Sequence, residues 1–122
     1  MEKKLSNFKW SDAALDMIAA RFRALGEANR LKLLMALEKG EQNVSSLVVM
    51  TGLAQANVSR HLQALADAGI LNRRKDSLNV YYIVADSAIF EMCNHMCGSL
   101  KRRIDSQADA FDRGSPERRK RP

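Results

Sequence analysis

The sequence predicts a mainly α-helical domain with a small β-hairpin, and three observations support this prediction. Apolar residues recur at helical spacing in several stretches, and glycines stand at the ends of some of them. After Gly69 the period changes from helical to alternating. The 122 residues include 46% hydrophobic but only 6% aromatic residues, which favours an aliphatic helical core over a β-sandwich. A chain of this length forms one domain with a real core.

Two helices are predicted at the start of the domain. Ser11 can cap the first helix, and Gly26 can end it. A second helix is expected roughly over residues 28–39, and Arg30 and Lys32 are expected to face outward from it. Its apolar side is predicted to consist of Leu31, Leu34, Met35 and Leu37.

A short helix, a glycine-containing turn and a longer helix are predicted next. Residues 41–44 form a connector, after which Ser45 or Ser46 can cap the short helix. The sequence Thr51-Gly52-Leu53 then supplies a tight turn. This order of elements is that of a helix-turn-helix.

The longer helix, over residues 53–69, is amphipathic. Val58, Leu62 and Leu65 recur at i, i+4 and i+7, so they share one face, and most polar residues lie outside it. Gln and Asn side chains can bond adenine, and Arg can bond guanine. The DNA-binding residues predicted on this helix are Gln55, Asn57, Ser59, Arg60 and Gln63. The alternative is a solvated helix face, which would be the better interpretation if the helix stood alone.

Two strands are predicted after Gly69, one beginning over residues 70–74 and one over residues 79–84, with residues 75–78 as the loop. A basic hairpin directly after a helix-turn-helix is a wing, so the predicted fold is a winged helix-turn-helix. Its basic residues, predicted to contact the DNA backbone, are Arg73, Arg74 and Lys75. The alternative is a solvated hairpin edge, since lysine on an edge also blocks strand pairing. The position after a helix-turn-helix favours DNA binding.

A last helix is predicted to begin at Asp86 or Ser87 and to carry a long apolar stripe. The core of the winged domain does not require this stripe, nor that of the first helix. We therefore expect these N- and C-terminal helices to pair with their copies in a homodimer. The stripes consist of Leu15, Ile18, Phe22 and Leu25 in the first helix, and of Ile89, Cys93, Met96, Cys97, Leu100 and Ile104 in the last.

The charge distribution predicts three segments. The formal net charge is +6, which permits nucleic-acid binding, but residues 113–122 contain five basic residues and one acidic residue. We expect a flexible N-terminus over residues 1–9, the winged helix-turn-helix domain over 10–108 and a basic disordered tail over 109–122. DNA binding must therefore be argued from the local placement of residues within the domain.

Several classes of protein are excluded by the same composition. No apolar run reaches the length of a membrane span, and the first residues lack the apolar core of a signal peptide. We expect a cytoplasmic protein with no membrane partner, whose two cysteines are reduced. No glycine loop for nucleotides and no set of serine, histidine and carboxylate suggests an enzyme.

Four stretches resemble the ArsR family of winged-helix repressors: residues 22–34 (FRALGEANRLKLL), 57–65 (NVSRHLQAL), 68–71 (AGIL) and 80–82 (VYY). The resemblance covers roughly residues 15–105. It implies a homodimeric repressor acting on a palindromic operator, whose DNA affinity an inducer changes, and it places the first and last helices in the dimer interface. His61 lies beside the apolar stripe and is expected to be structural.

Two metal sites typical of that family are missing from this sequence. The positions that match a pair of arsenic-binding cysteines hold Asn43 and Ser45. Of the zinc-binding positions across the last helices, Asp86 is kept. The positions that match its partners hold Ala88, Ser99 and Arg102. Neither site is therefore expected here.

Cys93 and Cys97 are four residues apart, which places both on one face of the last helix. They are either small core residues in the dimer seam or a thiol sensor. A sensor would bind a thiophilic ion such as As(III), Cd or Zn, or react with an oxidant or a sulfur species. No particular metal or cofactor is assigned. The alternative function for the whole chain is a protein–protein interaction module without a ligand switch.

Overall fold

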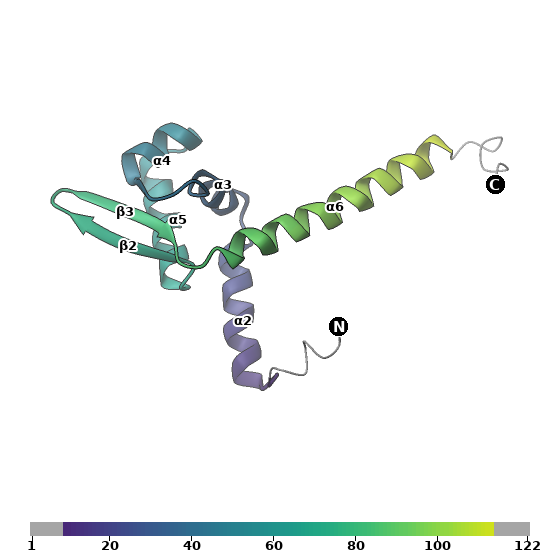
Figure 1. The fold of residues 1–122 in the computed structure, drawn as a ribbon, viewed down its shortest axis with the longest axis horizontal. Coiled ribbons are helices and arrows are strands. Elements are labelled where there is room, and N and C mark those ends of the chain that lie inside the picture. The colour runs from purple at the N-terminus through teal and green to yellow at the C-terminus, as the bar shows by residue number, and fades with distance from the viewer. Residues whose placement is uncertain (1–8, 114–122) are drawn as a thin grey trace. The chain divides into compact units, whose positions relative to one another are not determined.

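The computed structural model describes residues 9–113, and it confirms a mainly helical fold with a small antiparallel sheet (Figure 1). The chain divides into two compact units, one ending at Asp86 and one beginning at Ser87. The elements of the first unit are α2 (Asp12–Leu25), α3 (Ala28–Ala36), β1 (Gln42–Asn43), α4 (Val44–Thr51), α5 (Gln55–Asp67), β2 (Leu71–Asp76) and β3 (Asn79–Val84). The second unit contains α6 (Ala88–Asp112).

The first two helices begin where the sequence predicts, but the second is shorter. The Ser11 side chain accepts a hydrogen bond from the Ala14 amide at 3.1 Å, and Gly26 ends α2. Helix α3 ends at Ala36, three residues before the predicted end. After Ala36 the chain continues in hydrogen-bonded turns to Gly40, whose φ of +138° is a conformation that favours glycine.

The predicted connector 41–44 and the predicted cap of the next helix are both wrong. Residues 42 and 43 form the short strand β1, and Asn43 rather than Ser45 or Ser46 caps α4. The Asn43 side chain accepts a hydrogen bond from the Ser46 amide at 2.8 Å. Two residues are too few for an alternating pattern, so only pairing with a distant strand reveals β1.

The sheet has the order β1-β3-β2 and is antiparallel throughout. Strand β2 pairs with β3 from Leu71 opposite Val84 to Asp76 opposite Asn79. The loop between them is only Ser77-Leu78, so Lys75 lies within β2 and not in the predicted loop. Ser77 has a φ of +60°, and a positive φ at the first loop residue is typical of a two-residue hairpin.

The core of the first unit is mainly aliphatic, and α5 contributes the face that its periodicity predicts. Leu31 and Met35 of α3 are partly exposed, contrary to prediction, whereas Leu33 is fully buried. Arg30 is also directed inward, because its guanidinium meets buried partners on other elements. The residues buried here are Ala24, Leu25, Leu33, Leu34, Leu37, Leu47, Val58, His61, Leu62, Leu65, Ile70, Leu71 and Tyr82.

Helix α6 continues to Asp112, beyond the predicted domain end at 108. Pairs at i, i+4 support the helix in this part, with Lys101 at 3.4 Å from Asp105 and Arg113 at 3.7 Å from Asp109. Large apolar side chains remain exposed along it: Met96, Leu100, Ile104 and Phe111.

The rest of the predicted N-terminal segment (1–8) and of the tail (114–122) lies outside the described residues. Within residues 9–113, no helix is both long and apolar enough to cross a membrane.

Candidate nucleic-acid interface

A glycine and a threonine form the turn between α4 and α5. Gly52 ends α4 with a φ of +74°, a left-handed conformation in which any other side chain is strained. The Thr51 hydroxyl donates to the Leu47 carbonyl at 2.6 Å and accepts from the Leu53 amide at 3.3 Å. The turn therefore sets the direction in which α5 leaves α4.

Packing of one face of α5 exposes the other. Val58, Leu62 and Leu65 are fully buried, so the opposite side of the helix faces solvent. On that side the structure exposes the predicted residues Ser59, Arg60 and Gln63. Gln55 is exposed at the start of the helix, three residues before Val58, and Asn57 is half-buried.

Two hydrogen bonds order this outward face. The Arg60 guanidinium donates to Asn57 Oδ1 at 3.1 Å, and Gln63 Nε2 donates to Asp67 Oδ1 at 2.8 Å. Arginine and amide groups on the N-terminal half of a helix are the groups that read base edges in a major groove.

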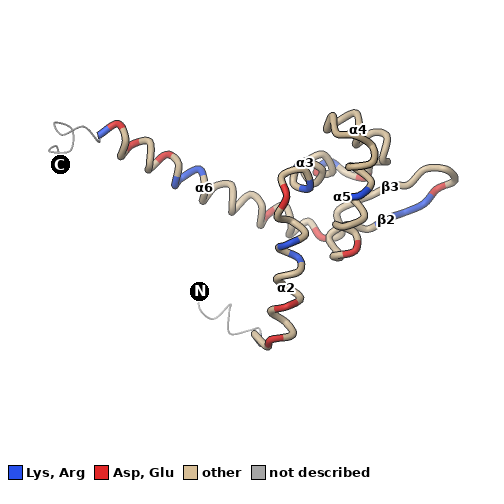
Figure 2. The backbone as a smooth tube through the Cα atoms, turned by 180° about the vertical axis from the view of Figure 1, so that it is seen from behind, with Lys and Arg blue, Asp and Glu red and all other residues tan. Residues whose placement is uncertain are grey.

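Figure 2 shows a continuous run of basic residues along β2. The side chains of this run do not all lie on one face of the sheet. Successive side chains of a strand point to opposite faces of the sheet. Arg73 pairs with Tyr82 in the register and Arg74 with Tyr81. Arg73 and Lys75 therefore lie on one face, and Arg74 lies on the other.

Arg74 is held by an acidic residue that the sequence reasoning missed. Its guanidinium donates to both carboxylate oxygens of Glu41, at 2.8 and 3.0 Å, and lies 4.5 Å from the centre of the Tyr81 ring. The hydrogen bond from Arg74 holds the pKa of the Glu41 carboxyl below its usual range, and Glu41 raises the pKa of Arg74. No local motif links positions 41 and 74, because the strand pairing alone brings them together.

His61 is buried on the inner side of α5 and is 2% exposed, as expected for a structural residue. Arg30 Nε donates to His61 Nδ1 at 3.0 Å, and His61 Nε2 lies 3.9 Å from Glu27 Oε1. An accepting Nδ1 requires a neutral ring with its proton on Nε2. Burial lowers the pKa of His61, and the positive charges of Arg60 and Arg30 lower it further, while Glu27 opposes them.

We expect His61 to make the fold sensitive to mild acid. An unfolded histidine takes up a proton as the pH falls through about 6.5. The folded ring resists protonation because its pKa is lowered, so the contribution of His61 to the free energy of unfolding is present above about pH 6.5 and is lost as the pH falls below that value. Through this one group, the free energy of unfolding falls by at most about 1.4 kcal/mol for each pH unit. Urea unfolding between pH 7.5 and 5 measures it. The variant His61→Gln should show a flatter profile, and a slope equal to that of the wild type would contradict this role.

The two cysteines of α6 differ in exposure. Cys93 is half-buried, and burial raises the pKa of its thiol, whereas Cys97 is exposed. Among residues 9–113, no three His, Cys, Asp or Glu side chains gather closely enough to hold a metal ion. A thiophilic ion at this place would be held by the two thiols of one chain alone or together with the same thiols of a second copy.

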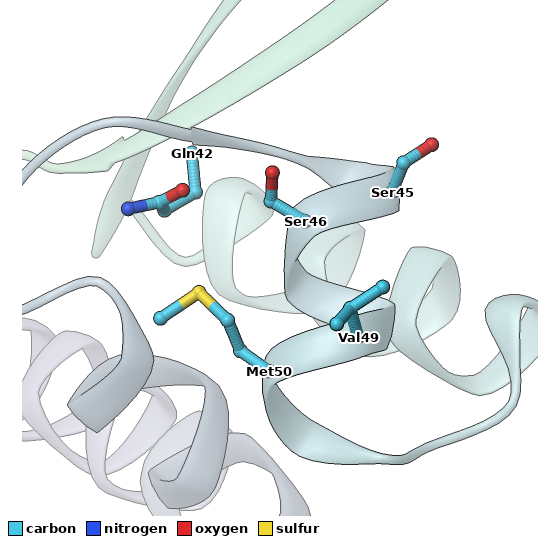
Figure 3. Close-up of a pocket in the computed structure, with 5 residues that line it drawn as sticks. All are labelled: Gln42, Ser45, Ser46, Val49 and Met50. Carbon is cyan, nitrogen blue, oxygen red and sulfur yellow. The ribbon is translucent and has the colours of Figure 1, made fainter.

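A shallow hollow of about 360 Å³ lies beside α4 (Figure 3). Its lining consists of Gln42, Ser45, Ser46, Val49 and Met50. The serine and glutamine side chains in this lining are neutral, and no lining residue titrates near neutral pH. The hollow therefore supplies no general acid or base.

Comparison with known proteins agrees with this geometry. The model of the bacterial regulatory proteins of the arsR family matches residues 27–73. The uncharacterised helix-turn-helix transcriptional regulator MJ1325 of Methanocaldococcus jannaschii is 39% identical over 67 residues, covering 53% of this chain and 75% of that protein. The probable mercury resistance operon repressor of Streptomyces lividans is 36% identical over 77 residues, covering 63% of this chain and 62% of that protein.

A solved structure shows the same fold. The homodimeric winged helix-turn-helix DNA-binding domain Mb0332 of Mycobacterium bovis matches with a TM-score of 0.60 and 28% identity, covering 84% of this chain and 91% of that one. The chain spans less than two thirds of the length of most related regulators that it matches. The family and these relatives are transcriptional regulators and not enzymes, which agrees with the class of protein that the sequence predicts. The family match to α3–β2, the relatives and the shared winged fold show that this chain belongs to the arsR family of bacterial regulatory proteins.

Proposed function

We propose that this chain is a transcriptional repressor that binds double-stranded DNA through the outward face of α5. The observation that supports this most strongly is that the outward face of α5 is held in place. Arg60 and Asn57 are joined by a hydrogen bond on this face, while the apolar side of the helix is fully buried. The proposed contacts to bases come from Gln55, Asn57, Ser59, Arg60 and Gln63, and those to the backbone from Arg73 and Lys75. The chain acts where the DNA is, in the cytoplasm.

A homodimer on a palindromic operator is the second part of the proposal. Exposed apolar side chains on α2 and α6 support it, among them Phe22 at 55% and Leu100 at 57% exposure. A two-fold dimer presents two copies of α5, which is why its operator has matching half-sites about one helical turn apart. The related Mycobacterium bovis domain is a homodimer.

Titration of one DNA duplex tests the function. The duplex carries an imperfect palindrome from the region upstream of the protein's own gene, and a shuffled duplex of equal length is the control. Binding should favour the palindrome and weaken steeply with salt, because counterions released from the phosphates rebind. Equal affinity for both duplexes, or none, would instead favour a protein–protein interaction module.

The proposed switch lies at Cys93 and Cys97, by thiol chemistry or by a thiophilic metal ion shared between copies. A disulfide between them within one intact helix is excluded on geometry, because their Cβ atoms are about 6 Å apart and a disulfide needs roughly 4 Å. Oxidation or metal binding would therefore link copies or unwind the helix, and either event changes the spacing of the two α5 helices. The related Streptomyces lividans protein is named as a probable mercury resistance operon repressor, which supports a thiophilic inducer.

In the chain unpaired with a second copy, we expect Cys97 to react before Cys93, because it is exposed while Cys93 is half-buried with a raised pKa. Mass spectrometry after timed exposure to a maleimide measures the two rates.

The variants Cys93→Ser and Cys97→Ser should bind the palindrome as the wild type does, while the double variant should no longer release DNA with Hg²⁺ or an oxidant. If the double variant still releases DNA on this treatment, the two cysteines are packing residues and not a sensor.

A further inference from the structure

We propose that Glu41 and Arg74 form a brace that positions the wing, and that Arg74 is a positioning residue and not a phosphate contact. The inference rests on the proposed DNA-binding function and assigns one of its three basic wing residues a different role. It begins from the register of the sheet, in which Asn43, Tyr81 and Arg74 lie side by side on one face.

The brace crosses all three strands. Glu41 is two residues before Asn43, so the alternation of the strand places its side chain on the same face as Arg74. Strands β1 and β2 are both paired with β3 and are not neighbours. The Arg74 side chain therefore spans the Tyr81 ring of β3 to reach Glu41, and the ring limits the orientations of the guanidinium.

The two ends of the brace belong to different elements of the winged helix-turn-helix. Arg74 is in the outer strand of the wing, whereas Glu41 directly precedes β1, whose Asn43 caps the first helix of the helix-turn-helix. A bidentate arginine–carboxylate pair has a defined geometry and is stronger than a single contact. The pair therefore restrains the wing relative to α4.

Local charge argues against Arg74 as a phosphate contact. Besides Glu41, the Asp76 carboxylate lies 3.6 Å from its guanidinium. One positive charge with two negative charges makes a net negative cluster, which repels phosphate. Arg73 and Lys75 lie on the other face of the strand, and the structure shows no ion pair from either to any residue within 9–113.

Salt dependence of DNA affinity distinguishes a brace from a phosphate contact. Each phosphate contact contributes about −0.9 to the slope of log K against log salt. We expect Arg73→Gln and Lys75→Gln each to make this slope shallower by about 0.9, the contribution of one phosphate contact. We expect Arg74→Gln to keep the wild-type slope and weaken affinity about two- to fivefold, since a partly exposed ion pair is lost. A slope reduced by one phosphate in Arg74→Gln would overturn the proposal.

The second test is whether removal of the Glu41 charge weakens or strengthens DNA binding. Glu41→Gln should bind more weakly than Glu38→Gln, a matched control in which an exposed carboxylate without an ion pair in residues 9–113 is removed. Tighter binding by Glu41→Gln than by the control would mean that Glu41 masks a phosphate contact, which contradicts a brace. The exchanged pair Glu41→Arg with Arg74→Glu should recover affinity relative to either single change, and failure to recover would also count against it.

Hydrogen exchange separates failure of the brace from failure of the proposed function. The amides of β2 and β3 should exchange faster in Glu41→Gln and Arg74→Gln than in Glu38→Gln, whether or not DNA is bound. If the wild type binds no duplex but this difference is found, the brace holds and the function is wrong. Equal exchange in all three variants would refute the brace.

Discussion

Replacement of Leu62 by alanine is expected to lower the free energy of unfolding by about 2–5 kcal/mol. Leu62 is fully buried on the inner face of α5, between the equally buried Val58 and Leu65. The change removes apolar contacts and leaves a cavity that the surrounding side chains fill only in part. Because small domains have a total stability of about 5–15 kcal/mol, this one substitution removes a large share of it.

Urea unfolding at one fixed protein concentration measures the effect of Leu62→Ala, since the proposed dimerisation would make stability depend on concentration. Val49→Ala on α4 is the matched control, because Val49 is 82% exposed. Its effect should stay within about 0.5 kcal/mol. A loss in Leu62→Ala no larger than in the control would show that α5 does not pack through this face.

Replacement of Arg60 by alanine is expected to weaken specific DNA binding by about 5- to 150-fold without unfolding the protein. A bidentate contact between arginine and guanine discriminates by roughly 1–3 kcal/mol, and each 1.4 kcal/mol is tenfold. Arg60 is exposed, and its hydrogen-bond partner Asn57 is on the same helix, so the core does not depend on it. Fluorescence anisotropy with the palindromic and shuffled duplexes measures the loss.

Lys39→Ala provides the control for Arg60→Ala, because it removes one exposed positive charge from the turn after α3. The two variants separate base reading from general electrostatics. Arg60→Ala should lose affinity for the palindrome and much less for the shuffled duplex, whereas Lys39→Ala should change both little. An equal loss for both duplexes in Arg60→Ala would assign Arg60 to the backbone and leave base reading to the other residues of α5.

The parts of the fold that local sequence determines were predictable. Helical periodicity predicted the buried face of α5, Ser11 predicted the start of α2, and Gly52 predicted the turn before α5. Each of these depends on contacts within a few residues, such as a cap, a left-handed glycine or one helical repeat. The polar face of α5 followed from the same periodicity, since fixing the buried side also fixes the exposed side.

The parts that depend on distant pairing were not predictable. Strand β1 exists because Gln42 and Asn43 pair with Tyr82 and Tyr81, nearly forty positions further along the chain. Arg30 was expected to face solvent, but it bonds His61 of another helix. The contact of Arg74 with Glu41 likewise appears only when the sheet is formed. Long-range polar contacts have no local period and thus leave no pattern in the sequence.

The two-residue loop between β2 and β3 makes this hairpin intolerant of single-residue insertions and deletions. The side-chain period of a strand is two and the short loop fixes the register, so adding or removing one residue between Lys75 and the loop would move every earlier side chain of β2 to the opposite face. Arg73 and Lys75 would then exchange faces with Arg74, and both the brace and the free positive charges would be lost together. Length variation in this part of the gene is therefore compatible with function only in steps of two residues, or where a bulge restores the register.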